Sequence, residues 1–193
     1  MTRGRLRDLR LVSLLERHDA TPVLAIFGVV NGFLSISLMA VAAFVTNAPF
    51  VFPSLGPTAF LFFYSPTAVT ASPRNAFLGH LIGAAMGWLS LAAFGLLDAG
   101  PALTAGVTLP RVLAAGMSLG LTSGLMILVR APHPPAGATT LIVSLGILTA
   151  PWQLAVLMLA VVLLTVQAFV INRLAGIPYP LWSAPSAPVA GGR

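Results

Sequence analysis

The sequence contains no cysteine and no lysine, and only four of its 193 residues are acidic. The missing thiols exclude disulfides, thiol catalysis and thiolate metal sites. The four carboxylates, Asp8, Glu16, Asp19 and Asp98, all lie outside the long apolar runs. Their scarcity removes a Ser-His-Asp arrangement, an acid pair for hydrolysis and a buried carboxylate for coupling to protons or sodium. We therefore expect no metal, no cofactor and no enzyme activity.

Charge of either sign is scarce, whereas apolar residues are abundant. The chain is 58% hydrophobic and 7% charged, while soluble domains carry roughly 25% charged residues. It is therefore predicted to be an integral membrane protein whose first partner is the lipid bilayer. The pI near 11.6 would suit a polyanion, but the arginines cluster at the ends of apolar runs. That placement marks membrane topology, and no nucleic acid is expected.

Four apolar runs are long enough to span a ~30 Å hydrocarbon core as helices. They cover residues 23–45, 74–97, 110–129 and 151–175. Thr21-Pro22 is interpreted as the N-cap and first position of the first helix. Residues 1–20 form a basic leader, either a short interfacial helix or a solvated arm that sets orientation. Residues 177–193 are rich in Pro, Ser, Ala and Gly and are predicted to be disordered.

Two shorter apolar pieces, residues 49–66 and 134–149, lie between these runs. Their uninterrupted helical parts, at about 57–64 and 135–148, would cover roughly 12–21 Å at 1.5 Å per residue. Neither comfortably spans the hydrocarbon core as a helix alone. The prolines and glycines around them predict half-helices, either re-entrant or discontinuous.

The order long, short, long occurs twice, which predicts one membrane repeat at 21–98 and a second at 107–176. Both short pieces pass through glycine and threonine, at Gly56-Pro57-Thr58 and at Gly137-Ala138-Thr139-Thr140. Matching Gly/Pro-interrupted segments are the best sequence pointer to a transport site. Chance similarity is the alternative, because these residues are common in membrane helices. The predicted fold is all-α, with four long transmembrane helices and two half-helices in a tandem repeat, parallel or inverted.

Two topologies remain open. If the short pieces are re-entrant, there are four spans, and Arg74 and Arg130 lie on the side opposite the N-terminus. If they cross as broken segments, Arg74, Arg130 and Arg173 share the N-terminal side, while Arg111 and Asp98 lie opposite. The positive-inside rule favours the second arrangement. Both place the N- and C-termini in the cytoplasm, and a bacterial inner membrane is expected.

The candidate site lies where the two half-helices begin. A helix N-terminus carries about +0.5 charge and free N–H groups, so two such ends meeting near the midplane would bind an anion. Glycines there let a ligand approach the backbone, and prolines fix a helix start without losing a ladder bond. The predicted substrate-binding residues are Ser54, Gly56, Thr58, His133, Pro134, Pro135, Gly137, Thr139 and Thr140.

Further polar residues are assigned to the mouth or lining of the path, namely Asn31, Arg74, Asn75, His80 and Arg130. Arg74 or Arg130 would attract anions at a mouth. Asn31 is either a link between helices or pore lining, and His80 suits a hydrogen bond between helices better than ligand binding. His133 either fixes the helix break or relays a proton.

Glycine recurs at every fourth position in two of the long runs. One series is residues 79, 83 and 87, and the other is residues 116, 120 and 124. Small residues at this spacing predict close helix packing in both places.

The run His133-Pro134-Pro135-Ala136-Gly137-Ala138-Thr139 resembles the signature of the HPP family of integral membrane proteins. Pro53 to Ala59 and Ser72-Pro73-Arg74-Asn75, followed by Gly79-His80, also fit that family's pattern. The likeness covers roughly residues 23–175. It implies four transmembrane helices, and plastid and cyanobacterial members are associated with nitrite transport.

The residues and the resemblance together predict passage of a small monovalent inorganic anion, with nitrite as the foremost candidate. A homo-oligomer is expected, because few helices enclose a pore poorly. The alternatives are a non-transporting membrane scaffold and a membrane-embedded enzyme using His133. The enzyme would need a second catalytic group, and the sequence offers no carboxylate or thiol nearby.

Overall fold

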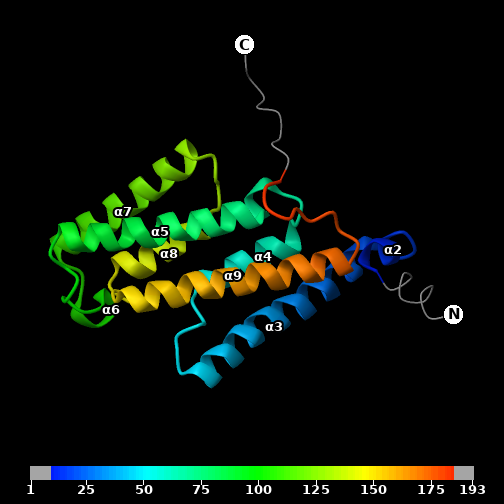
Figure 1. Ribbon diagram of the computed structural model, residues 1–193, viewed down its shortest axis with the longest axis horizontal. Helices are drawn as coiled ribbons and strands as arrows, with labels where there is room; N and C mark the ends of the chain where they lie inside the picture. Colours follow the sequence, from blue (N-terminus) through cyan, green and yellow to red (C-terminus); the bar gives the residue numbers. More distant parts are fainter. Residues whose placement is uncertain (1–9, 185–193) are drawn as a thin grey trace, which may run out of the picture.

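The structure is a computed structural model that describes residues 10–184. Over this range the chain is helical, with no strand (Figure 1). The elements are α2 (Leu11–Leu15), α3 (Ala20–Thr46), α4 (Leu55–Tyr64), η1 (Val69–Ala71), α5 (Pro73–Ala93), α6 (Ala102–Ala105), α7 (Leu109–Leu128), α8 (Ala136–Ser144) and α9 (Pro151–Leu174). The first nine residues of the predicted basic leader lie outside the described residues.

Four helices of the described chain, α3, α5, α7 and α9, are long and apolar enough to cross a membrane. The two short helices, α4 and α8, have 10 and 9 residues. The order along the chain is therefore long, short, long in each half. This confirms the predicted all-α membrane fold with two half-helices.

Local signals set the helix ends. Proline occupies the first turn of α5, α7 and α9, where its missing N–H costs no hydrogen bond. Asp19 caps α3, and its side chain accepts the Thr21 N–H at 3.0 Å. The cap is thus two residues earlier than the Thr21-Pro22 prediction. Asn47, with φ of 51°, ends α3 in the left-handed region.

Hydrogen bonds between distant segments show which helix ends lie together. At the N-terminal end of the molecule, Val12 N–H donates to the Ala175 carbonyl (3.4 Å) and Arg74 N–H donates to the Trp182 carbonyl (3.0 Å). At the far end, Ala102 N–H donates to the Leu145 carbonyl (2.8 Å). Accordingly α5 runs away from the N-terminal end, while α7 and α9 return to it (Figure 1).

The two halves are inverted relative to each other. After α3 the chain turns back to the middle of the molecule, and α4 continues toward the N-terminal end (Figure 1). After α7 it again turns back to the middle, but α8 continues toward the far end. The arrangement gathers Arg74, Arg130 and Arg173 at the N-terminal end and leaves Arg111 at the far end. This is the charge distribution of the six-crossing scheme.

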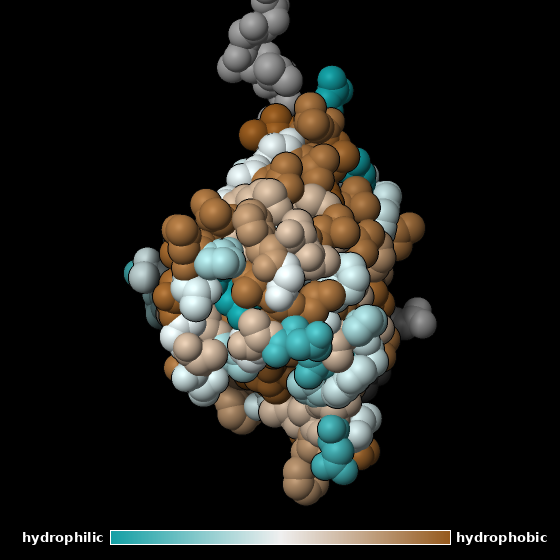
Figure 2. All heavy atoms as spheres, turned by 90° about the vertical axis from the view of Figure 1, so that its left-hand side faces the viewer, coloured by the Kyte–Doolittle hydropathy of each residue, from teal (hydrophilic) through white to brown (hydrophobic). Residues whose placement is uncertain are grey.

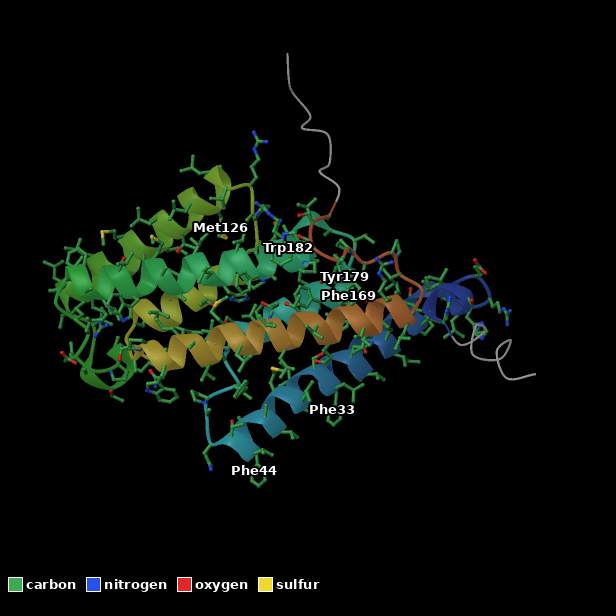
Figure 3. The ribbon with its side chains drawn as sticks, viewed as in Figure 1. Phe33, Phe44, Met126, Phe169, Tyr179 and Trp182 are labelled. Carbon is green, nitrogen blue, oxygen red and sulfur yellow. The ribbon has the colours of Figure 1, made fainter. Side chains whose placement is uncertain are left out.

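The outer surfaces suit a bilayer. Phe33 and Phe44 on α3 are 71% and 85% exposed and point away from the other helices (Figure 3). The far end differs: Figure 2 shows hydrophilic and neutral residues over its middle and lower part, with apolar residues mainly above and at the edges. An apolar side wall and a partly polar end are what a membrane-spanning protein requires.

The close contact of α5 with α8 depends on the first glycine series. A Cβ on Gly79 would lie 2.8 Å from the His133 Cβ, and one on Gly83 would lie 2.7 Å from the Ala136 carbonyl oxygen. A Cβ on Gly87 would likewise clash with Val143. Packing is therefore confirmed for this series. A Cβ added to any glycine of the second series, on α7, would meet no neighbouring segment of the described chain within 4 Å. The opposite face of α7 is the buried one.

The segment after α9 differs from the expectation of disorder. Tyr179 is fully buried, its hydroxyl donates to the Ala71 carbonyl (2.7 Å), and its ring packs edge-on against Phe62. Trp182 lies beside the start of α5 (Figure 3). The expectation of disorder rested on the Pro, Ser, Ala and Gly content of this segment and did not allow for the packing of these two aromatic side chains. Residues 185–193 lie outside the described residues.

The α5–α8 contact predicts different effects for two glycine substitutions. Gly83→Ala should lower stability by about 1–3 kcal/mol, because the new methyl group overpacks the interface. At Gly28 on α3 an added Cβ would meet no atom within 4 Å. Gly28→Ala should therefore leave stability unchanged or raise it, because alanine favours helix. Thermal unfolding of the detergent-solubilised protein measures both. Equal stability of the two variants would contradict the close contact.

Candidate functional site

The first turns of α4 and α8 meet at a buried polar cluster. Thr58 comes from α4, Thr139 from α8, His80 from α5 and His133 from the segment before α8, and all four are fully buried. We call these four residues the histidine cluster. The two imidazole centroids are 5.0 Å apart.

Hydrogen bonds join the members of the histidine cluster. Thr58 Oγ1 lies 2.9 Å from His80 Nε2 and 3.3 Å from His133 Nε2. His80 Nδ1 lies 2.6 Å from Thr139 Oγ1. The cluster therefore links both halves of the chain through the side chains of four separate segments.

The cluster is held in place from outside by backbone. The η1 turn presents the Thr70 carbonyl to His133 Nδ1 at 2.8 Å. The missing side chain of Gly79 makes room for His133 against α5. The ring of Phe62 lies next to that of His133, with ring centroids 6.4 Å apart. These contacts fix the orientation of the His133 ring.

The acceptors determine where protons sit. A carbonyl only accepts, so His133 Nδ1 must carry hydrogen toward Thr70. Thr58 has one hydroxyl proton and three candidate acceptors, the Ser54 carbonyl and His80 Nε2 at 2.9 Å each and His133 Nε2 at 3.3 Å. The Ser54 carbonyl can only accept, so we assign the Thr58 proton to it. His80 Nε2–H then donates to Thr58, and His80 Nδ1 accepts from the Thr139 hydroxyl.

The two half-helix starts offer different donors. At α8 the N–H groups of Ala136, Gly137 and Ala138 each donate to the carbonyl three residues earlier, at 3.0–3.1 Å. The Gly137 N–H is therefore engaged in this conformation. At α4 the Ser54 hydroxyl is fully buried and has no hydrogen-bond partner. A Cβ on Gly56 would meet nothing within 4 Å.

The remaining residues of the predicted substrate site surround the cluster. Thr140 Oγ1 bonds to Thr122 Oγ1 (2.9 Å) and to the Ala136 carbonyl (3.1 Å), so it faces α7 rather than His80. Pro135 is the N-cap residue of α8 and is buried, whereas Pro134 is exposed.

Arg74 and Asn75 are tied to backbone at the N-terminal end. The Arg74 guanidinium donates to the carbonyls of Val129 (3.0 Å) and Arg130 (2.9 Å), which closes the C-terminus of α7. Asn75 accepts from Arg74 (3.1 Å) and donates to the Val69 carbonyl (2.9 Å). The side chain of Arg130 is exposed, and its φ of 52° lies in the left-handed region.

Asn31 lies apart from the histidine cluster. Its Nδ2 donates to the Phe27 carbonyl in the same helix (2.7 Å). With Arg10 and Leu174, Asn31 lines a cavity of about 390 Å³ between α2, α3 and the end of α9. The structure therefore does not bring Asn31 together with the other predicted lining residues.

Several residues of this region escaped the sequence reasoning. Thr70 contributes only a backbone carbonyl, which carries no side-chain signal. Asn172 on α9 donates to the Phe62 carbonyl of α4 (3.0 Å), although the two residues are far apart in the sequence. Arg111, Ser118 and Thr122, in contrast, lie on one buried face of α7, and their spacing of seven and four residues would have indicated that face.

No group of three His, Asp or Glu side chains within residues 10–184 is placed to hold a metal ion. The two histidines of the cluster instead bond to threonine side chains and to a carbonyl. In this conformation the chemistry on offer is hydrogen bonding and proton transfer between imidazole and hydroxyl groups.

Fold and site together define a polytopic helical membrane protein with inverted halves whose half-helices begin at a shared buried cluster. Residues 17–180 match the family described as HPP, transmembrane region. The chain therefore belongs to the HPP family, as the motif around His133 suggested. No curated protein and no solved structure matches the chain.

The cluster predicts a distinct tautomer for each buried histidine. We expect neutral His133 to carry its proton on Nδ1, because Thr70 requires a donor there, and neutral His80 to carry its proton on Nε2. Side-chain ¹⁵N chemical shifts of histidine-labelled protein measure both, with His80→Gln used to assign the signals. The exposed His18 is the internal reference. A proton on Nε2 alone at His133 would contradict the described geometry.

Proposed function

We propose that this protein carries a small monovalent inorganic anion across the membrane, with nitrite as the expected substrate. The observation that carries the proposal is the meeting of two oppositely directed half-helix starts at the histidine cluster. Each helix N-terminus contributes about half a positive charge. Within residues 10–184 no carboxylate bonds to the cluster. The resulting field favours an anion over a cation.

Ser54 at the start of α4 is the strongest single candidate for an anion ligand. A fully buried hydroxyl without a partner forgoes a hydrogen bond that most buried polar groups make. An oxyanion placed there would accept that hydrogen bond while lying at the positive end of α4. The α8 start is less available, because its first N–H groups already have acceptors.

The histidine cluster supplies a route by which proton and anion movements would be coupled. Protonation of His133 Nε2 would turn it from acceptor to donor toward Thr58. Thr58 would then have only the Ser54 carbonyl as acceptor, which locks its hydroxyl in one direction. Loss of that proton frees the hydroxyl to turn back. Since the cluster is fully buried, either change must accompany an opening of the α4 and α8 starts to water.

The distribution of arginine supports an orientation. Five described arginines lie at the N-terminal end, namely Arg10, Arg17, Arg74, Arg130 and Arg173. The far end carries Arg111 and the exposed Asp98. The positive-inside rule then supports cytoplasmic N- and C-termini, in a bacterial inner membrane.

Cysteine labelling tests this orientation, and the chain has no native cysteine to interfere. Arg130→Cys, at an exposed position of the N-terminal end, should react with a membrane-impermeant maleimide only from the cytoplasmic side. Leu103→Cys in α6, which is 78% exposed, should react only from outside. The reverse pattern, with Arg130→Cys labelled only from outside and Leu103→Cys only from the cytoplasm, would contradict the six-crossing arrangement and match the four-span one.

We also propose that the protein forms a homo-oligomer. Gly116, Gly120 and Gly124 leave a smooth face of α7 without contacts in the described chain. Small residues at this spacing allow a second helix to approach closely in the bilayer. This face supports self-association, and light scattering of the purified protein gives the oligomeric state.

Flux into liposomes tests the transport function directly. Purified protein should carry nitrite, with nitrate, formate and chloride as competitors that rank its selectivity. Ser54→Ala should lower the nitrite flux by about three- to tenfold, since one hydrogen bond to the anion is lost. Ser35→Ala, which removes another buried, unpartnered hydroxyl from α3, should leave the flux unchanged.

Two results would oppose the proposal. Absence of protein-dependent flux for all four anions would favour the scaffold interpretation. A flux that falls equally in Ser54→Ala and Ser35→Ala would separate transport from the α4 start. An enzyme using His133 has less support, because the histidine cluster contains no carboxylate or thiol as a second catalytic group.

A further inference from the structure

Arg111 is a buried cation without a counter-ion in the part of the chain that the structure describes. Its side chain is 3% exposed, and it lies in the first turn of α7 at the far end. Its guanidinium donates to the carbonyls of Ser144 (3.2 Å) and Gly100 (2.7 Å). No carboxylate of the described residues forms an ion pair with it. Three of its five N–H groups have no acceptor there.

The helix dipoles do not compensate the Arg111 charge. Its contact with the Ser144 carbonyl places it at the C-terminus of α8, worth about half a negative charge. Its own position in the first turn of α7 adds about half a positive charge. The two contributions roughly cancel, so close to one full positive charge remains. A buried charge in this condition is costly unless something of opposite sign binds to it.

A second observation points to the same place. The Ser144 hydroxyl is fully buried and has no hydrogen-bond partner, although its own carbonyl binds Arg111. The Ser90 hydroxyl on α5 is likewise buried without a hydrogen-bond partner. The contacts of Gly83 with Thr140 and of Gly87 with Val143 show that α5 and α8 run side by side in the same direction. This register puts Ser90 near the level of Ser144.

A line of buried polar residues connects Arg111 with the histidine cluster. The buried face of α7 carries the polar residues Arg111, Ser118 and Thr122, with Ala114 between the first two. Thr122 bonds to Thr140, which follows Thr139 of the cluster on α8. Ionisable side chains inside a membrane protein commonly mark substrate pathways, and Arg111 is such a side chain.

We propose that Arg111 and Ser144 form a binding site for a small planar oxyanion, of the class of nitrite, nitrate and formate, at the far end of the molecule. The guanidinium supplies charge and coplanar donors that match two oxygens of such an anion, and the Ser144 hydroxyl supplies a neutral donor. As the far mouth of an anion route the site rests on the proposed function; as a binding site it stands without it.

Arg111 also has a structural role that any test must respect. Its bonds to Gly100 and Ser144 join the segment before α6 to the end of α8, and a Cβ on Gly146 would lie 2.9 Å from Nη1. Arg111→Gln therefore risks misfolding. Arg111→Lys keeps the charge but loses the planar fork, and Ser144→Ala breaks no hydrogen bond of the protein.

The experiment is equilibrium binding of sodium nitrite to the purified full chain by calorimetry, at constant ionic strength with gluconate as the replacing anion. It is carried out on wild type and in a Ser54→Ala background, so that binding at the α4 start does not mask the far end. Folding of each variant is checked by circular dichroism and by elution as a single species.

We expect Arg111→Lys and Ser144→Ala each to weaken nitrite binding by about three- to tenfold, and folded Arg111→Gln by about tenfold or more. Two matched controls should bind as wild type: Arg173→Gln removes an exposed charge of α9, and Ser35→Ala removes an unpartnered hydroxyl of α3. Wild-type affinity in Ser144→Ala and Arg111→Lys, or no nitrite binding by wild type, overturns the proposal.

Flux measurements on the same variants separate this site from the transport function. Nitrite binding that depends on Arg111 without flux in liposomes leaves the site in place and removes transport. Flux that is unchanged by Arg111→Lys and by Ser144→Ala keeps transport and removes the far-end site from its route.

Discussion

The approach of α5 to α8 is the contact on which the rest of the structure depends. Three glycines of α5 bring its backbone against α8, and a Cβ added at Gly83 or Gly87 would lie within 3 Å of a backbone oxygen of α8, that of Ala136 or of Thr140. Only at that distance do the side chains of His80 and Thr139 form a 2.6 Å hydrogen bond. The same approach leaves room for His133 beside Gly79. In a bilayer, where apolar burial between helices gains little, such backbone proximity is the main source of packing energy.

The interior built on this contact is polar yet almost free of carboxylate. The histidine cluster satisfies its members through threonine hydroxyls and carbonyls, and Arg111 is met by carbonyls alone. Positive potential therefore comes from helix starts and from one guanidinium, and no buried acidic group of residues 10–184 neutralises it. The electrostatic field of such an interior favours an anion over a cation, and the proposed function rests on this. The buried hydroxyls of Ser54 and Ser144, each without a partner, mark where the polar interior is incomplete.

The inverted arrangement gives these features their positions. Because α4 and α8 run in opposite directions from a common centre (Figure 1), the positive ends of both half-helices lie together and their negative ends lie apart. The α8 C-terminus then reaches Arg111 at the far end, while Arg74 closes the C-terminus of α7 at the other. Arginine thus stabilises helix ends at both sides of the molecule, and only Arg111 does so while buried.

The sequence alone determined the membrane class, the four spans, the two half-helices and the family, because hydropathy, prolines and a local motif are all encoded within single segments. It also indicated that Thr58, His133 and Thr139 belong together, since both repeats place such residues at a helix start. It failed for the segment after α9, where Tyr179 is buried by Phe62 and by the Ala71 carbonyl. It also placed Asn31 in a lining from which the fold separates it.

Only the tertiary structure decided that His80 bonds to the cluster, that the Gly137 N–H is occupied, and that Arg111 has no counter-ion among the described residues. Each of these depends on which atoms of distant segments meet. The register of α5 against α8 and the direction of α4 determine which atoms meet. Neither can be predicted from the residue pattern of a single segment.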